Sequence, residues 1–94
     1  MVEFFRGDAG PLRFVVASGG QALDLSGASA VFLVAPGRTL SVTVQSAVSG
    51  ALEYAIRAAD WPTVGLYMGQ LRVSLADGLT THTSVFPVTV LPTL

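Results

Sequence analysis

The side chains that could perform chemistry are few and scattered. His82 is the single histidine, and the chain has no cysteine. A two-histidine metal site and a thiol nucleophile are therefore impossible within one copy. A serine nucleophile would need His82 as its base and a strand-to-helix turn to present it, and the sequence offers no such turn. We expect no catalytic residue and no enzymatic activity, and we interpret His82 as a structural residue.

Four aspartates lie close to glycine or proline, in stretches that are typical of turns: Asp8, Asp24, Asp60 and Asp77. An aspartate at a turn hydrogen-bonds its own backbone two residues further on. None of the intervals between them follows the D-x-D-x-D spacing of a calcium loop. We therefore expect turn caps, with no bound metal and no cofactor.

Trp61 and Tyr67 each allow a binding interpretation and a structural one. Trp61 precedes Pro62, so it could be an exposed platform for a sugar or a partner chain, or a lid that closes one end of the fold. Tyr67 follows Gly65 near the start of a strand, where a tyrosine often hydrogen-bonds back across the preceding loop. The lid is the interpretation we favour, and Trp61 is kept as a candidate partner-binding residue.

Composition excludes several classes of function. A chain of 94 residues can fill one hydrophobic core, so residues 1–94 are expected to form a single domain. Charged residues make up 12% of the chain and the net charge is −1, which leaves no basic patch for nucleic acid. The longest stretch without a formal charge, 78–94, contains Pro87 and Pro92 and is not a membrane span. We expect a soluble protein without an export signal and without a nucleic-acid or membrane partner.

Alternation of apolar and polar residues indicates β-strands along the whole chain. In 65–78, for example, Leu71, Val73 and Leu75 alternate with Arg72 and Ser74. Gly-rich or Pro-containing breaks recur about every ten residues, and no window of a dozen residues keeps helical spacing without a breaker. The stretches expected to contain strands are 2–5, 11–18, 28–35, 39–45, 51–58, 65–78 and 84–91.

Seven short strands without helices predict two packed sheets. The predicted fold is therefore all-β, an immunoglobulin-like antiparallel β-sandwich of about seven strands, with a closed small barrel as the alternative. The turn at Asp77 decides the side on which His82 lies. A two-residue loop would pair His82 with Val73 on the inner face, whereas a three-residue bulged loop at 76–78 would pair it with Arg72 on the outer face.

A series of short motifs then points to a family. They are "F-x-x-GD-x-x-PLRF-x-V", "GGQALDLSGASAVF", "G-x-LEY-x-I-x-AAD", "VGLYMGQLRV" and "DGLTTHTSVFPVTV". In this order they resemble the immunoglobulin-like N-terminal domain of phage baseplate upper proteins. The resemblance covers nearly the whole chain and implies that the "GD…PL" element crosses from the first strand to the second. No site residue carries over from it.

The resemblance implies a structural protein of a tailed-phage virion. We expect a component of the baseplate, tail, neck or capsid surface that is assembled in the host cytoplasm, forms a homo-oligomer and docks onto other virion proteins. The residues expected on strand faces opposite the core are Phe5, Val15, Val31, Leu33 and Met68. Of these, all except Val15 are candidate partner-binding residues, together with Trp61. The alternative function is a non-catalytic module that binds a glycan or receptor, for which Trp61 and Tyr67 are the motivation.

Overall fold

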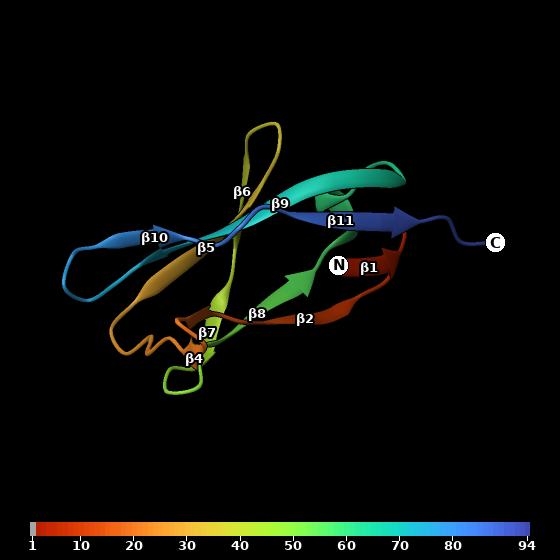
Figure 1. Cartoon of the computed structure of the whole chain (residues 1–94). Helices are drawn as coiled ribbons and strands as arrows, with labels where there is room; N and C mark the ends of the chain where they lie inside the picture. The colour runs from red at the N-terminus through yellow and green to blue at the C-terminus, as the bar shows by residue number, and fades with distance from the viewer. Residues whose placement is uncertain (1) are drawn as a thin grey trace.

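The computed structural model describes residues 2–94 and contains two packed β-sheets (Figure 1). The larger sheet contains β1 (Val2–Phe5), β5 (Ser29–Val34), β6 (Arg38–Ser41), β9 (Gly65–Ser74), β10 (Thr80–His82) and β11 (Phe86–Leu91). The smaller sheet contains β2 (Gly10–Val15), β7 (Thr43–Ser46) and β8 (Ala51–Ile56). A short ribbon pairs β3 (Ala17–Ser18) with β4 (Gln21–Ala22), and one 3₁₀ turn, η1, spans Ala58–Asp60.

The predicted all-β sandwich is confirmed. Hydrogen-bonded neighbours run in the order β1-β11-β9-β5-β6 in the larger sheet, with β10 also paired to β9, and β2-β8-β7 in the smaller one. The orders β2-β8-β7 and β5-β9-β11 are those of strands B-E-D and C-F-G in an immunoglobulin domain. The closed barrel is wrong, because within residues 2–94 β1 and β6 remain edge strands.

Two features differ from the predicted antiparallel arrangement. β1 runs parallel to β11, with Val2 opposite Val88, because the chain crosses to the smaller sheet directly after β1. The predicted strand 39–45 is divided between the sheets, with β6 in the larger sheet and β7 in the smaller one. The chain can change sheets here because Leu40, Val42 and Val44 all contribute to the core on both sides of the break.

The core is rich in aromatic rings. Phe32 of β5 is fully buried, and its ring centroid lies 5.4 Å from both Phe14 and Tyr54 of the smaller sheet. It also stacks on Phe86 of β11 at 5.9 Å. Rings from both sheets therefore meet at one point between the layers. The buried hydrophobic residues are Phe4, Val16, Leu25, Phe32, Val34, Leu40, Leu52, Tyr54, Trp61, Leu71, Val73, Val88 and Val90.

Three of the four aspartates cap turns. Asp24 and Asp77 bond the backbone two residues on, as predicted, whereas Asp8 bonds the backbone three residues before it. Asp8 accepts a hydrogen bond from the Phe5 N–H at 2.9 Å, and Asp77 accepts one from the Leu79 N–H at 3.0 Å. Asp24 accepts the hydroxyl and the backbone N–H of Ser26 at 2.7 and 2.9 Å, and these hydrogen bonds lower the pKa of its carboxyl group. These carboxylates hold the loops between strands.

The β9–β10 turn selects the outer face for His82. The Leu75 N–H donates to the Leu79 carbonyl at 2.8 Å, which leaves the three residues 76–78 in the loop. His82 is exposed and lies opposite Arg72 in the register, so the bulged-loop alternative is confirmed.

We predict that position 69 must remain a glycine, because core side chains leave no room for a Cβ there. A Cβ at Gly69 would lie 2.7 Å from Cε1 of Phe32 and 3.1 Å from Cε2 of Phe86. We expect Gly69→Ala to lower the free energy of unfolding by about 1–3 kcal/mol, because a packed core resists added volume. Urea denaturation followed by tryptophan fluorescence measures the change. Gly37→Ala is the control, since nothing lies within 4 Å of a Cβ there, and equal stability of the two variants would contradict the prediction.

Candidate functional site

The outward side chains in the middle of β1, β5, β9 and β11 form a largely apolar surface. Strand residues alternate between the two faces, so the neighbours of buried Phe32 and Val34 on β5, namely Val31 and Leu33, face outward. We call this surface the outer sheet face. It consists of Glu3, Phe5, Val31, Leu33, Leu66, Met68, Gln70, Arg72, Pro87, Thr89 and Leu91.

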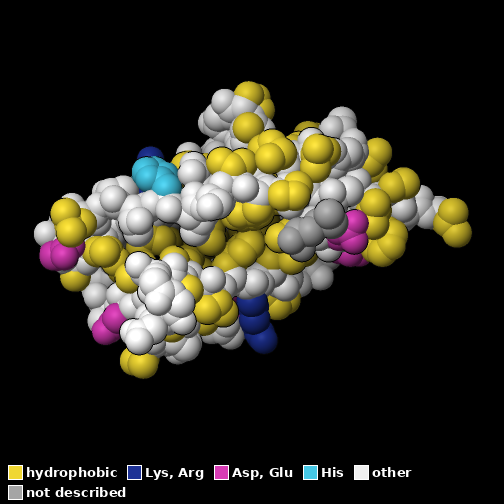
Figure 2. Space-filling view, viewed as in Figure 1, with side chains coloured by type: hydrophobic (Ala, Val, Ile, Leu, Met, Phe, Trp, Pro, Cys, Tyr) yellow, Lys and Arg dark blue, Asp and Glu magenta, His cyan; other side chains and the backbone are white. Residues whose placement is uncertain are grey.

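The register places the apolar members of this surface side by side. Met68 lies opposite Pro87, and Phe5 lies opposite Leu91. Leu66 is 68% exposed, Phe5 49% and Met68 40%. Hydrophobic side chains accordingly gather along the upper right of the molecule, over β9 and β11 (Figure 2). An exposed apolar band that extends across several strands is typical of an interaction surface.

A shallow groove of about 320 Å³ extends the outer sheet face toward the β5–β6 turn. Leu33, Met68 and Val85 line it, together with the turn residues 35–37. The Gln70 side chain at its edge donates to the Thr83 carbonyl at 2.9 Å, so its amide is held in place. The apolar side chains of Leu33, Met68 and Val85 give the groove the size and character to accept an apolar side chain.

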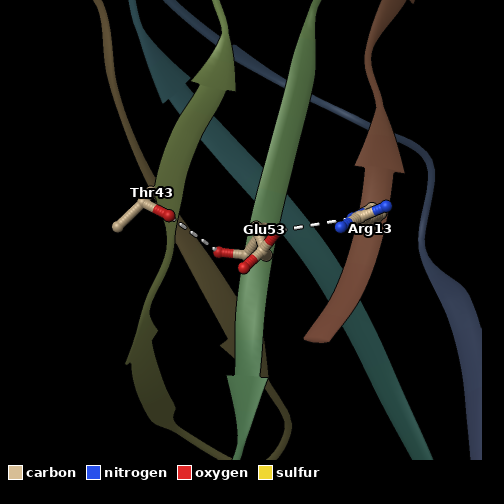
Figure 3. Close-up of polar contacts among 3 residues, drawn as sticks. All are labelled: Arg13, Thr43 and Glu53. Atoms are coloured by element: carbon tan, nitrogen blue, oxygen red, sulfur yellow. Dashed lines mark hydrogen bonds and ion pairs between the residues drawn. The ribbon is translucent and has the colours of Figure 1, made fainter. Parts of the chain in front are cut away.

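The outward face of the smaller sheet differs in character. Arg13 of β2 and Glu53 of β8 lie opposite each other, and Arg13 Nε is 3.3 Å from Glu53 Oε2 (Figure 3). The Thr43 hydroxyl donates to the Glu53 carbonyl at 3.4 Å. Arg13, Glu53 and Thr43 therefore pair with one another on this face, which also exposes the side chain of Val15.

Four of the five candidate partner-binding residues come together on the outer sheet face. They are Phe5, Val31, Leu33 and Met68, from β1, β5 and β9. Leu66 also belongs to this surface, although the sequence analysis did not name it. Leu66 and Met68 both occupy outward, even-numbered positions of β9, and this apolar pair was the signal that could have identified Leu66.

Trp61 does not belong to the surface, and its interpretation as an exposed platform is wrong. Its side chain is 2% exposed and packs edge-to-face on Phe4 at 5.2 Å and on Tyr67 at 5.0 Å. Its indole N–H donates to the Tyr54 hydroxyl at 3.1 Å. The Arg38 guanidinium covers the ring, 5.6 Å from its centroid. The alternative, a lid over one end of the sandwich, is confirmed.

The loop before β9 is pinned as the sequence predicts. The Tyr67 hydroxyl donates to the Thr63 carbonyl at 2.7 Å and lies 3.0 Å from the Thr63 hydroxyl. Tyr67 is thereby committed to the fold rather than to a ligand.

Tyr54 connects Trp61 to the η1 turn. Its hydroxyl donates to Asp60 Oδ2 at 2.5 Å, and the Asp60 carbonyl accepts a hydrogen bond from Arg38. Burial, reinforced by the hydrogen bond to Asp60, raises the pKa of Tyr54 to about 12. Asp60 is thus a partner of a buried tyrosine, which differs from the predicted backbone cap.

The described residues were searched for metal sites and for membrane-spanning helices. Residues 2–94 contain no group of three or more His, Asp or Glu side chains that could hold a metal ion. In the same part of the chain no helix is long and apolar enough to cross a membrane.

The fold and the outer sheet face together define a β-sandwich with an exposed apolar band on its larger sheet. Its structure is similar to that of the N-terminal domain of phage TP901-1 ORF48, with a TM-score of 0.81 and 17% identity, over 97% of this chain and 84% of that one. The resemblance to a phage N-terminal domain is thus confirmed for the fold. CopC from Methylosinus trichosporium OB3b is less similar, with a TM-score of 0.56 and 18% identity, over 97% of this chain and 83% of that one. No protein-family model matches the chain, and no curated protein matches its sequence.

The raised pKa of Tyr54 predicts alkaline destabilisation. The pKa of Tyr54 is about 12 in the folded protein and 10.0 ordinarily, so the folded state favours the protonated hydroxyl. The contribution of Tyr54 to the free energy of unfolding is therefore fully present below about pH 10 and is lost as the pH rises toward 12. Two pKa units correspond to about 3 kcal/mol of unfolding free energy. Thermal unfolding from pH 8 to 12 measures the loss. Tyr54→Phe should remove this contribution and Tyr67→Phe should keep it; an identical pH profile for wild type and Tyr54→Phe would contradict the assignment.

Proposed function

We propose that this chain is a non-catalytic structural protein of a tailed-phage virion that docks onto other virion proteins through the outer sheet face. The exposed apolar band across β1, β11, β9 and β5 carries the proposal. Interface cores are depleted in charge and enriched in aromatic and Met residues, and Phe5 and Met68 fit this composition. The similarity to a phage N-terminal domain supports the virion as the setting.

The structure also removes the motivation for a glycan-binding module. A sugar-binding platform needs an exposed aromatic ring, whereas Trp61 is buried. Tyr67 is the second residue that suggested glycan binding, and its hydroxyl group donates a hydrogen bond to the Thr63 carbonyl. No observation on the described residues favours a second function.

Purified particles test the proposal. Particles of the phage that encodes this chain are banded on a density gradient, and quantitative mass spectrometry measures the chain against the major capsid protein. We expect a fixed ratio that survives washing in high salt, because apolar contacts are insensitive to screening. Absence of the chain from intact particles would overturn the virion assignment.

A matched pair of variants tests the surface. Leu66 on the larger sheet is 68% exposed and Val15 on the smaller sheet is 70% exposed. We expect Leu66→Lys to reduce incorporation into particles at least tenfold, since it places a charge in the apolar band, and Val15→Lys to be incorporated normally. Equal incorporation of the two folded variants would show that docking uses another surface.

A further inference from the structure

The outer sheet face carries two formal charges among the described residues, and they lie at its opposite ends. Glu3 lies opposite Thr89, which in turn lies opposite Leu66, and Arg72 is further along β9. With about 3.4 Å per residue and about 4.8 Å between strands, the two charges are about 22 Å apart. They cannot pair within one copy, and the apolar band fills the space between them.

This arrangement is complementary to itself. When two identical faces pack about a two-fold axis, a residue of one copy meets a different residue of the other copy and the reverse contact forms as well, so every contact away from the axis occurs twice. An axis that passes near Pro87, perpendicular to the line from Glu3 to Arg72, brings each Glu3 opposite the Arg72 of the other copy. The same axis superimposes the two apolar bands.

We propose that the outer sheet face binds a second copy of this chain, with two reciprocal Glu3–Arg72 ion pairs that flank an apolar centre around Met68 and Pro87. The inference rests on the proposed function, because it names a second copy of this chain as the virion protein that docks on that surface. A face with one acid and one base has no excess of either sign with which to attract a strongly charged partner. Its charges are satisfied best by its own copy.

The available area fits a reversible dimer. The four strands of this face, about 4.8 Å apart and with about six residues of each, cover roughly 400 Å² per copy as a flat projection. Two copies would therefore bury about 800 Å² or more, which is the size of a weak, transient interface. We expect a dimer that dissociates on dilution.

Charge reversal tests the pairing. Sedimentation equilibrium over a concentration series gives the dissociation constant of the wild-type dimer, and we expect Glu3→Arg and Arg72→Glu each to raise it roughly tenfold or more. Each single variant would place like charges opposite each other at both ends. Circular dichroism verifies that both variants are folded. Arg13→Glu on the smaller sheet is the control and should leave the constant unchanged.

Mixing the two single variants gives the sharpest result. In a mixed dimer one copy supplies two cations and the other supplies two anions, so both ion pairs form again. We expect the equimolar mixture, and the Glu3→Arg/Arg72→Glu double variant, to regain wild-type dimerisation. A wild-type chain that stays monomeric, or a mixture without rescue, would overturn the inference. If the chain does not dimerise but particles still contain it, the proposed function remains intact. If the chain dimerises but is absent from particles, only the proposed function is overturned.

Discussion

The sandwich depends on the packing of Phe32 between the two sheets. Its ring contacts Phe14 and Tyr54 from one layer and Phe86 from the other, and it lies against the bare backbone of Gly69. Because aromatic rings of this size must interlock without voids, they fix how the sheets face each other.

Trp61 extends the same packing to the end of the molecule. A buried indole requires a partner for its N–H group, and the Tyr54 hydroxyl supplies it. Tyr54 in turn needs Asp60, which the η1 turn presents. The end of the sandwich is therefore closed by a chain of hydrogen bonds around an aromatic core, and the polar groups there stabilise the fold.

The outward faces of the two sheets differ in how their charged side chains are placed. On the smaller sheet, Arg13 pairs with Glu53 across neighbouring strands, and Val15 is exposed on the same sheet. The larger sheet presents an apolar band whose two charges, Glu3 and Arg72, are too far apart to meet. Phe5, Leu66 and Met68 are all exposed on this face, and the apolar band that contains them is the physical basis for both proposals.

The sequence by itself determined the strands, the all-β class and the outward positions of Phe5, Val31, Leu33 and Met68, because side-chain alternation is a local property of an extended chain. It also determined the turn caps at Asp8, Asp24 and Asp77, which depend on neighbouring backbone groups. Only the tertiary structure decided that β1 runs parallel to β11, that the strand 39–45 divides between sheets and that Trp61 is buried. Those features depend on contacts between residues far apart in the chain, and local patterns carry no information about them.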